Sequence, residues 1–104
     1  MKNYGVTIYP NGNNEFDLIN ILNVIGEKGR ILDWRISNLD CLGKNSETLN
    51  QLSDKNEQIS GTEFYQLFSR IYQTIEGNFV AFENDSTNAL ITIRAIDGSV
   101  FDVE

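Results

Sequence analysis

The chain has 104 residues, 40% of them hydrophobic, and its 15 acidic and 8 basic residues give a net charge of −7. This length predicts one globular domain over residues 1–104, large enough to bury a core without disulfides or metals. An acidic surface repels the phosphates of nucleic acids and of anionic membranes, so we expect neither as a partner. A basic protein is the partner that such a charge attracts, although solubility alone accounts for the same charge.

The sequence contains no histidine and one cysteine, Cys41. Without histidine there is no Ser-His-Asp or Cys-His site and no ordinary zinc site. No basic residue stands beside Cys41 to lower its pKa, so we expect an inert thiol. The chain shows no signal-peptide pattern, no apolar run long enough to cross a bilayer and no need of an oxidising compartment. We therefore expect a cytoplasmic protein.

The first two elements are predicted from their periodicity. Residues 4–9, YGVTIY, alternate with period two, which predicts a strand. Asn14 is then placed to cap a helix whose third residue is Asp17. Apolar residues recur at three- and four-residue steps through EFDLINILNVIG, and Gly26 suits the left-handed position after a helix. Residues 26–29, GEKG, are predicted to form the helix exit and a turn.

The stretch ILDWRISNLDCLG, residues 31–43, contains the only tryptophan and the only cysteine of the chain. Its first half alternates apolar and polar residues, which is typical of a half-buried strand. This pattern places Trp34 on the core face and Asp33 and Arg35 on the opposite face. Residues 38–43 are predicted to be the exit from that strand. The stretch is thus expected to be scaffold rather than a reaction centre.

Residues 44–58, KNSETLNQLSDKNEQ, are polar, with two leucines as their only apolar residues. Such a composition is typical of surface segments. Ser46 is able to start one or two helical turns. Most of this segment is nevertheless expected to be a mobile surface loop.

The strongest local signal in the chain predicts a second helix after this loop. Ser60 and Glu63 have the spacing of a capping box, and Ile59 and Phe64 have the spacing of a hydrophobic staple. Apolar residues then continue at helical spacing. The predicted helix ends at Gly77.

Three strands are expected after the second helix, at NFVAFE, ALITIRAI and SVFDVE. Paired residues share a face of the sheet, so the length of the last loop fixes the register. A three-residue loop, Ile96-Asp97-Gly98, pairs Ile91 with Val103 and Ile93 with Phe101, and places Gly98 where a bulge needs positive φ. A two-residue loop would set Ile93 opposite an aspartate. We therefore expect the three-residue loop.

These elements predict an α+β fold in the order β-α-β-(loop)-α-β-β-β. Two helices are expected on one face of a mostly antiparallel sheet of about five strands. One alternative remains for the two strands that flank the first helix. Because a single helix joins them, they can also be parallel neighbours.

Four apolar residues, Val80, Phe82, Leu90 and Val100, fall on the opposite face of the last three strands. An uncovered apolar patch often marks an interface. Cover by residues 44–58 or by a chain end is an equally weighted alternative. With neighbouring charged residues, the candidate interface consists of Asp33, Arg35, Asp40, Val80, Phe82, Glu83, Leu90 and Val100.

No motif in the sequence predicts catalysis or a bound cofactor. The glycines match neither phosphate-binding pattern, and the turns NDSTN and NGNNEFD lack the spacing of a calcium loop. Asp33, Asp40 and Glu83 can perform acid-base chemistry only if they converge in a cleft. We therefore expect no catalytic, cofactor or metal site.

The functional hypothesis is a small, acidic, non-catalytic protein-binding domain. Its concrete form is an immunity-type inhibitor of a basic partner protein, as in small bacterial proteins that neutralise a toxin; this analogy rests on size and charge alone. The alternatives are a small carboxylate-based enzyme or ligand-binding domain, with its site between sheet and helices, and a protein that forms homodimers through the Val80, Phe82 and Leu90 face.

Overall fold

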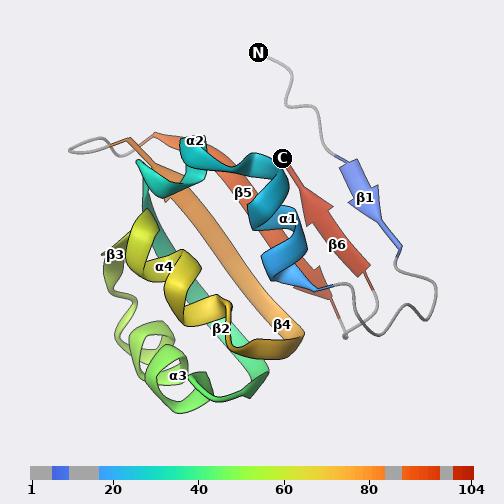
Figure 1. Ribbon diagram of the computed structural model, residues 1–104, viewed down its shortest axis with the longest axis vertical. Helices are drawn as coiled ribbons and strands as arrows, with labels where there is room; N and C mark the ends of the chain where they lie inside the picture. The colour runs from blue at the N-terminus through green and yellow to red at the C-terminus, as the bar shows by residue number, and fades with distance from the viewer. Residues whose placement is uncertain (1–5, 10–16, 84–87, 97–99) are drawn as a thin grey trace.

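The computed structural model describes residues 6–9, 17–83, 88–96 and 100–104 (Figure 1). Within them the chain forms four helices and one six-stranded sheet, so the predicted α+β class is confirmed, with one strand more than expected. The elements are β1 (Val6–Ile8), α1 (Leu18–Ile25), α2 (Glu27–Arg30), β2 (Asp33–Gly43), α3 (Ser46–Lys55), β3 (Gln58–Ser60), α4 (Gly61–Phe68), β4 (Ile71–Phe82), β5 (Ala89–Ile96) and β6 (Val100–Val103).

The strand order is β1-β6-β5-β4-β2-β3, and all five neighbouring pairs are antiparallel. The parallel alternative for the two strands that flank the first helix is wrong, because β1 pairs with β6 at the far edge from β2. Helices α1, α2 and α4 lie in front of the sheet in Figure 1. The core lies between this layer and the sheet, and Leu49 of α3 belongs to the same buried cluster.

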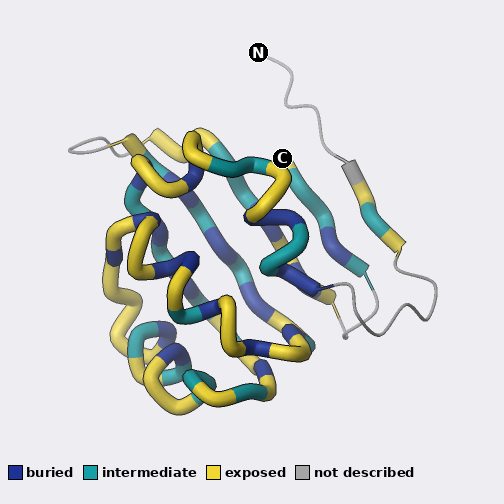
Figure 2. The backbone as a smooth tube through the Cα atoms, in the orientation of Figure 1, coloured by how far each residue is buried: buried dark blue, intermediate teal, exposed yellow. Residues whose placement is uncertain are grey.

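Trp34 occupies the centre of the core, as its alternating neighbours predict. Its side chain is 0% exposed, and its ring stacks on that of Phe64 with centroids 4.6 Å apart. The indole N–H donates a hydrogen bond to the carbonyl of Gly29 at 2.8 Å, so its polar atom is satisfied inside the core. Figure 2 shows buried and less buried positions taking turns along β2 and β4, which is the pattern of strands with one covered face.

The first helix begins later than the sequence predicts. Its N-cap is Asp17, and Asn14 lies outside the described residues. The Asn20 side chain accepts a hydrogen bond from the Asp17 N–H at 2.7 Å, which fixes the start of the helix. Gly26 ends the helix with φ of 67°, as expected. The predicted exit and turn that follow are instead the short helix α2.

The long strand β2 was only half predicted. It continues to Gly43, so the predicted exit at residues 38–43 is wrong. Its register against β4 shifts between Ser37 and Asp40, and Asn38 there has a positive φ of 53°. A bulge of this kind changes which residues face the core, and the alternation that reveals the strand is lost after Ser37. Cys41 is nevertheless buried, opposite Thr74 of β4.

The predicted loop at residues 44–58 is instead the helix α3 followed by the start of β3. Leu49 is 0% exposed, and the Ser53 hydroxyl accepts a hydrogen bond from the Leu39 N–H at 3.2 Å. Asn56 ends α3 in the left-handed conformation. Two apolar residues three positions apart are enough to anchor this helix because the bulged half of β2 packs against it.

The second predicted helix is correct at its start and wrong at its end. The Ser60 hydroxyl caps α4 by accepting a hydrogen bond from the Glu63 N–H at 3.2 Å. The helix stops at Phe68, and residues 71–77 belong to β4. Gly77 does not end a helix: a Cβ built on it would lie 2.6 Å from Cζ of Phe79, so the glycine leaves room for this ring.

The last hairpin has the predicted face and a different register. Ile93 pairs with Val103 and Ala95 with Phe101, two residues away from the predicted pairs. A shift of two residues leaves each side chain on the same face of the sheet. The prediction of which side chains share a face is therefore confirmed. The expected bulge at Gly98 falls outside the described residues.

Candidate functional site

The candidate site is the face of the sheet opposite the helices, which we call the open face. Arg35 pairs with Val80 and Asp33 with Phe82 in the ladder between β2 and β4. Because their chain neighbours, Trp34 among them, point into the core, these side chains point away from it. Residues 44–58 form α3 and the sheet edge, so they do not supply the cover that the sequence left open.

Arg35 and Phe82 form the best-defined contact of the open face. The guanidinium carbon of Arg35 lies 5.6 Å from the centroid of the Phe82 ring. Its Nη2 donates to Oε1 of Gln58 at 3.3 Å, and Nε2 of Gln58 donates to Oδ2 of Asp33 at the same distance. Nε of Arg35 is buried without an acceptor among the described residues. A buried donor without an acceptor costs free energy of folding.

Apolar side chains continue the open face across β4, β5 and β6. Leu90 is 46% and Ile96 is 41% exposed, while Val80, Phe82 and Val100 are partly buried. Ile96 was missed by the sequence, which placed it in the last loop. Its pairing with Val100 puts it on this face. The only signal that could have found it is the correct register of the hairpin.

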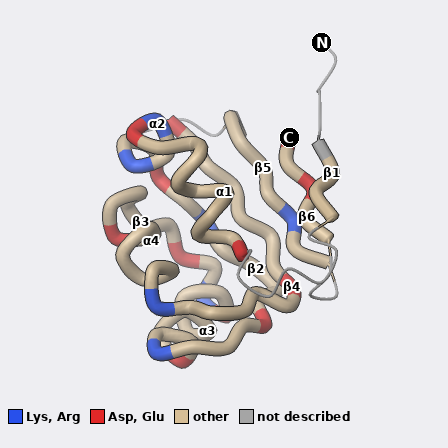
Figure 3. The backbone as a smooth tube through the Cα atoms, turned by 45° about the vertical axis from the view of Figure 1, so that its right-hand side comes forward, with Lys and Arg blue, Asp and Glu red and all other residues tan. Residues whose placement is uncertain are grey.

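Polar side chains border this apolar area on the side of β1 and β6. Arg94 of β5, the blue segment on that strand in Figure 3, forms an ion pair with Glu104 at 3.7 Å. The Thr7 hydroxyl donates to Oδ1 of Asp102 at 2.7 Å. The open face thus has an apolar middle, a polar border and charges of both signs, which is how protein interfaces are commonly built.

The three candidate carboxylates do not converge. Asp33 and Asp40 stand seven residues apart on β2, roughly 20 Å along an extended strand. Asp40 is exposed and pairs with Glu76, and Glu83 follows the opposite end of β4, beyond the Asp33 and Phe82 pair. Apart from Asp40 and Glu83, the candidate interface residues that pair in the ladders share the open face: Asp33, Arg35, Val80, Phe82 and Val100. Leu90 lies at the register shift opposite Ala81 and Phe82 and is 46% exposed.

The buried ionisable groups lie on the core side and hold the fold together. Burial raises the pKa of the Asp17 carboxyl, and hydrogen bonds from Thr74 lower it in part. Its Oδ1 accepts from the Thr74 N–H and its Oδ2 from the Thr74 hydroxyl, both at 2.7 Å. Burial, with the charges of Asp40 and Asp17, raises the pKa of Cys41 to about 11, so this thiol is protonated at neutral pH.

Residues 6–9, 17–83, 88–96 and 100–104 also bear on two other kinds of site. In them no three His, Cys, Asp or Glu side chains are grouped so that they could hold a metal ion. No helix in the described part of the chain has the length and apolar character needed to cross a membrane.

Comparison with known proteins gives no relative: no protein-family description, no curated protein and no solved structure matches this chain.

Proposed function

We propose that this chain is a small, non-catalytic protein-binding domain whose open face docks a partner protein. The observation that carries the proposal is the asymmetry of the sheet. One face is buried under helices, while the other presents Leu90, Ile96 and the Arg35–Phe82 contact to solvent. Exposed apolar groups beside a fixed arginine are typical of the centre of a protein interface.

The net charge of −7 favours a basic partner, because opposite net charges speed association. An immunity-type inhibitor that occupies a basic protein is the concrete form of this proposal, and its support is the chain's size and charge together with the open face. A cytoplasmic location is part of the same proposal.

Self-association through the open face is the second candidate. Charges of both signs, on Asp33, Arg35, Arg94 and Asp102, lie on this face. Such a patch can pair with a second copy of itself about a two-fold axis, as most homodimers do.

A matched pair of substitutions tests the proposal. Val80→Lys places a charge on the open face, and Val24→Lys makes the same change on α1, where Val24 is 88% exposed on the helix side. Each chain is immobilised and exposed to the same native lysate, and circular dichroism verifies that both are folded. We expect basic proteins retained by the wild type and by Val24→Lys to be lost from Val80→Lys.

Leu90→Lys, at a more exposed position of the open face, replaces Val80→Lys if the latter unfolds. Partners lost from Val24→Lys and kept by both open-face variants would contradict the proposal. Sedimentation of the same proteins separates the second candidate. A wild-type dimer that becomes a monomer in the open-face variants alone identifies self-association.

A further inference from the structure

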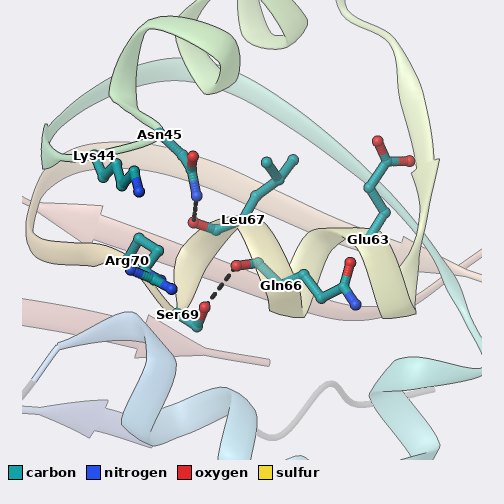
Figure 4. A pocket seen from close by; sticks show the side chains of 7 residues that line it. All are labelled: Lys44, Asn45, Glu63, Gln66, Leu67, Ser69 and Arg70. Atoms are coloured by element: carbon teal, nitrogen blue, oxygen red, sulfur yellow. Dashed lines mark hydrogen bonds between the residues drawn. The ribbon is translucent and has the colours of Figure 1, made fainter.

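A hollow lies between the end of α4 and the turn that follows β2, away from the open face (Figure 4). Its volume is about 470 Å³, and it is open to solvent because most of its lining residues are exposed. Lys44 and Asn45 line it from the turn, and Glu63, Gln66, Ser69 and Arg70 line it from α4 and the residues after it.

The backbone brings the two cations of this hollow together. Gly43 has a φ of 149°, and a Cβ built on it would lie 2.5 Å from the carbonyl oxygen of Arg70. Only glycine therefore lets the two chain segments approach so closely. The next N–H, that of Lys44, donates to the same Arg70 carbonyl at 3.2 Å. In Figure 4 the Lys44 and Arg70 side chains lie next to each other at one end of the hollow.

Two carbonyl groups at the end of α4, those of Gln66 and Leu67, already have partners. Nδ2 of Asn45 donates to the Leu67 carbonyl at 3.0 Å, and the Ser69 hydroxyl donates to the Gln66 carbonyl at 2.6 Å. Two cations are therefore not needed to satisfy these acceptors.

Neither cation has an acidic partner in the described part of the chain, where the ion pairs are Arg30–Glu27 and Arg94–Glu104. Glu63, the one carboxylate of the hollow, stands six residues before Ser69 on α4, about 9 Å along a helix. Figure 4 shows it at the opposite end from the two cations. The hollow thus has a positive end and a negative end.

We propose that this hollow binds a small phosphate ester that carries hydroxyl groups, such as a sugar phosphate. The phosphate lies between Lys44 and Arg70, whose charges attract an oxyanion and whose N–H groups donate to it. The hydroxyl groups lie toward Gln66, which donates and accepts, and Glu63, which accepts. A volume of about 470 Å³ is larger than a phosphate alone needs, and Glu63 disfavours a second anionic group at the far end.

An NMR titration of the ¹⁵N-labelled protein tests this assignment. Glucose 6-phosphate, inorganic phosphate and glucose are added separately at constant ionic strength. We expect saturable shifts of the amides that line the hollow with glucose 6-phosphate, weaker binding of inorganic phosphate and no response to glucose. Shifts that stay linear in concentration would show that the two cations have no ligand of this class.

Charge-matched variants make the test specific. Lys44→Gln with Arg70→Gln removes both cations of the hollow and should raise the Kd of glucose 6-phosphate at least about tenfold. Lys28→Gln with Lys55→Gln removes two cations elsewhere and should leave the Kd unchanged. Equal losses in the two double variants would mean that net charge alone attracts the ligand, and the proposal would be wrong.

Glu63→Ala separates the two sources of phosphate. If Glu63 accepts hydroxyl groups, this change weakens glucose 6-phosphate binding and leaves inorganic phosphate binding no weaker. Equal affinity of the wild type for both ligands would overturn the role of Gln66 and Glu63 and leave a site for the free anion.

Discussion

The indole N–H of Trp34 donates to the carbonyl of Gly29 at 2.8 Å, and this bond joins the start of β2 to the short helix α2. The bond is buried, so neither partner can turn to water if the other is removed. The tryptophan therefore contributes to stability both by packing and by satisfying a carbonyl of the helical layer.

Trp34→Phe should lower the free energy of unfolding by about 2–4 kcal/mol, because it leaves a cavity beside Phe64 and an unpaired Gly29 carbonyl. Urea denaturation monitored by far-UV circular dichroism measures the change. Val24→Ala, at a side chain that is 88% exposed, is the control and should stay within about 0.5 kcal/mol. A Trp34→Phe value as small as that of the control would contradict the central place of the ring.

The free energy of unfolding of the wild type, taken relative to that of Asp17→Asn, should fall as the pH rises. Burial raises the pKa of the folded carboxyl above its ordinary value of 3.8, so the folded state holds this proton more tightly than the unfolded state. This tighter binding of the proton stabilises the folded state. The stabilisation is complete below pH 3.8 and is lost as the pH rises through the pKa of the Asp17 carboxyl in the folded state.

The measurement is the unfolding free energy of the wild type minus that of Asp17→Asn, determined by urea denaturation at several pH values. We expect this difference to fall with increasing pH. A difference that increases with pH would show that the hydrogen bonds from Thr74 outweigh burial, which would place the folded pKa below the ordinary value.

Gly77→Ala should destabilise the fold by about 1–3 kcal/mol, because its Cβ would lie 2.6 Å from the Phe79 ring. The control is a double-mutant cycle with Phe79→Leu, which removes the ring that the new methyl group meets. Gly77→Ala should cost less in that background. An equal cost in both backgrounds would mean that the glycine serves the backbone rather than the ring.

Cys41 should react slowly with iodoacetamide while the protein is folded. A pKa of about 11, against 9.0 for the free side chain, lowers the thiolate fraction near neutral pH about a hundredfold. Mass spectrometry of the alkylated protein at about pH 8, with and without urea, measures the ratio. Alkylation at similar rates in both conditions would show that the thiol is more accessible than its 4% exposure indicates.

Local alternation predicts the parts of this fold in which each strand keeps one face to the core. It places Trp34 inward and gives the correct face to Ile93 and Phe101. The same period-two logic assembles most of the open face, because parity decides which of Val80, Phe82 and Val100 lie together.

Other parts depend on residues far away in the chain. Ile71 and Ile75 fit the apolar spacing of a helix. Residues 71–74 form a strand instead, because they pair with Cys41, Leu42 and Gly43. The bulge after Ser37 hides the second half of β2 in the same way. Sequence patterns also could not reveal the Lys44 and Arg70 hollow, since these cations are 26 residues apart in the chain and meet only through the Gly43 contact.

The pairing of β1 with β6 has a consequence for how the protein is made. Thr7 and Asp102 form a hydrogen bond across 95 residues of sequence. A ribosome releases the chain from its N-terminus, so β1 emerges long before β6, its neighbour in the sheet, exists. During synthesis β1 has no strand to join, and β5 keeps an unprotected edge, until β6 has left the exit tunnel.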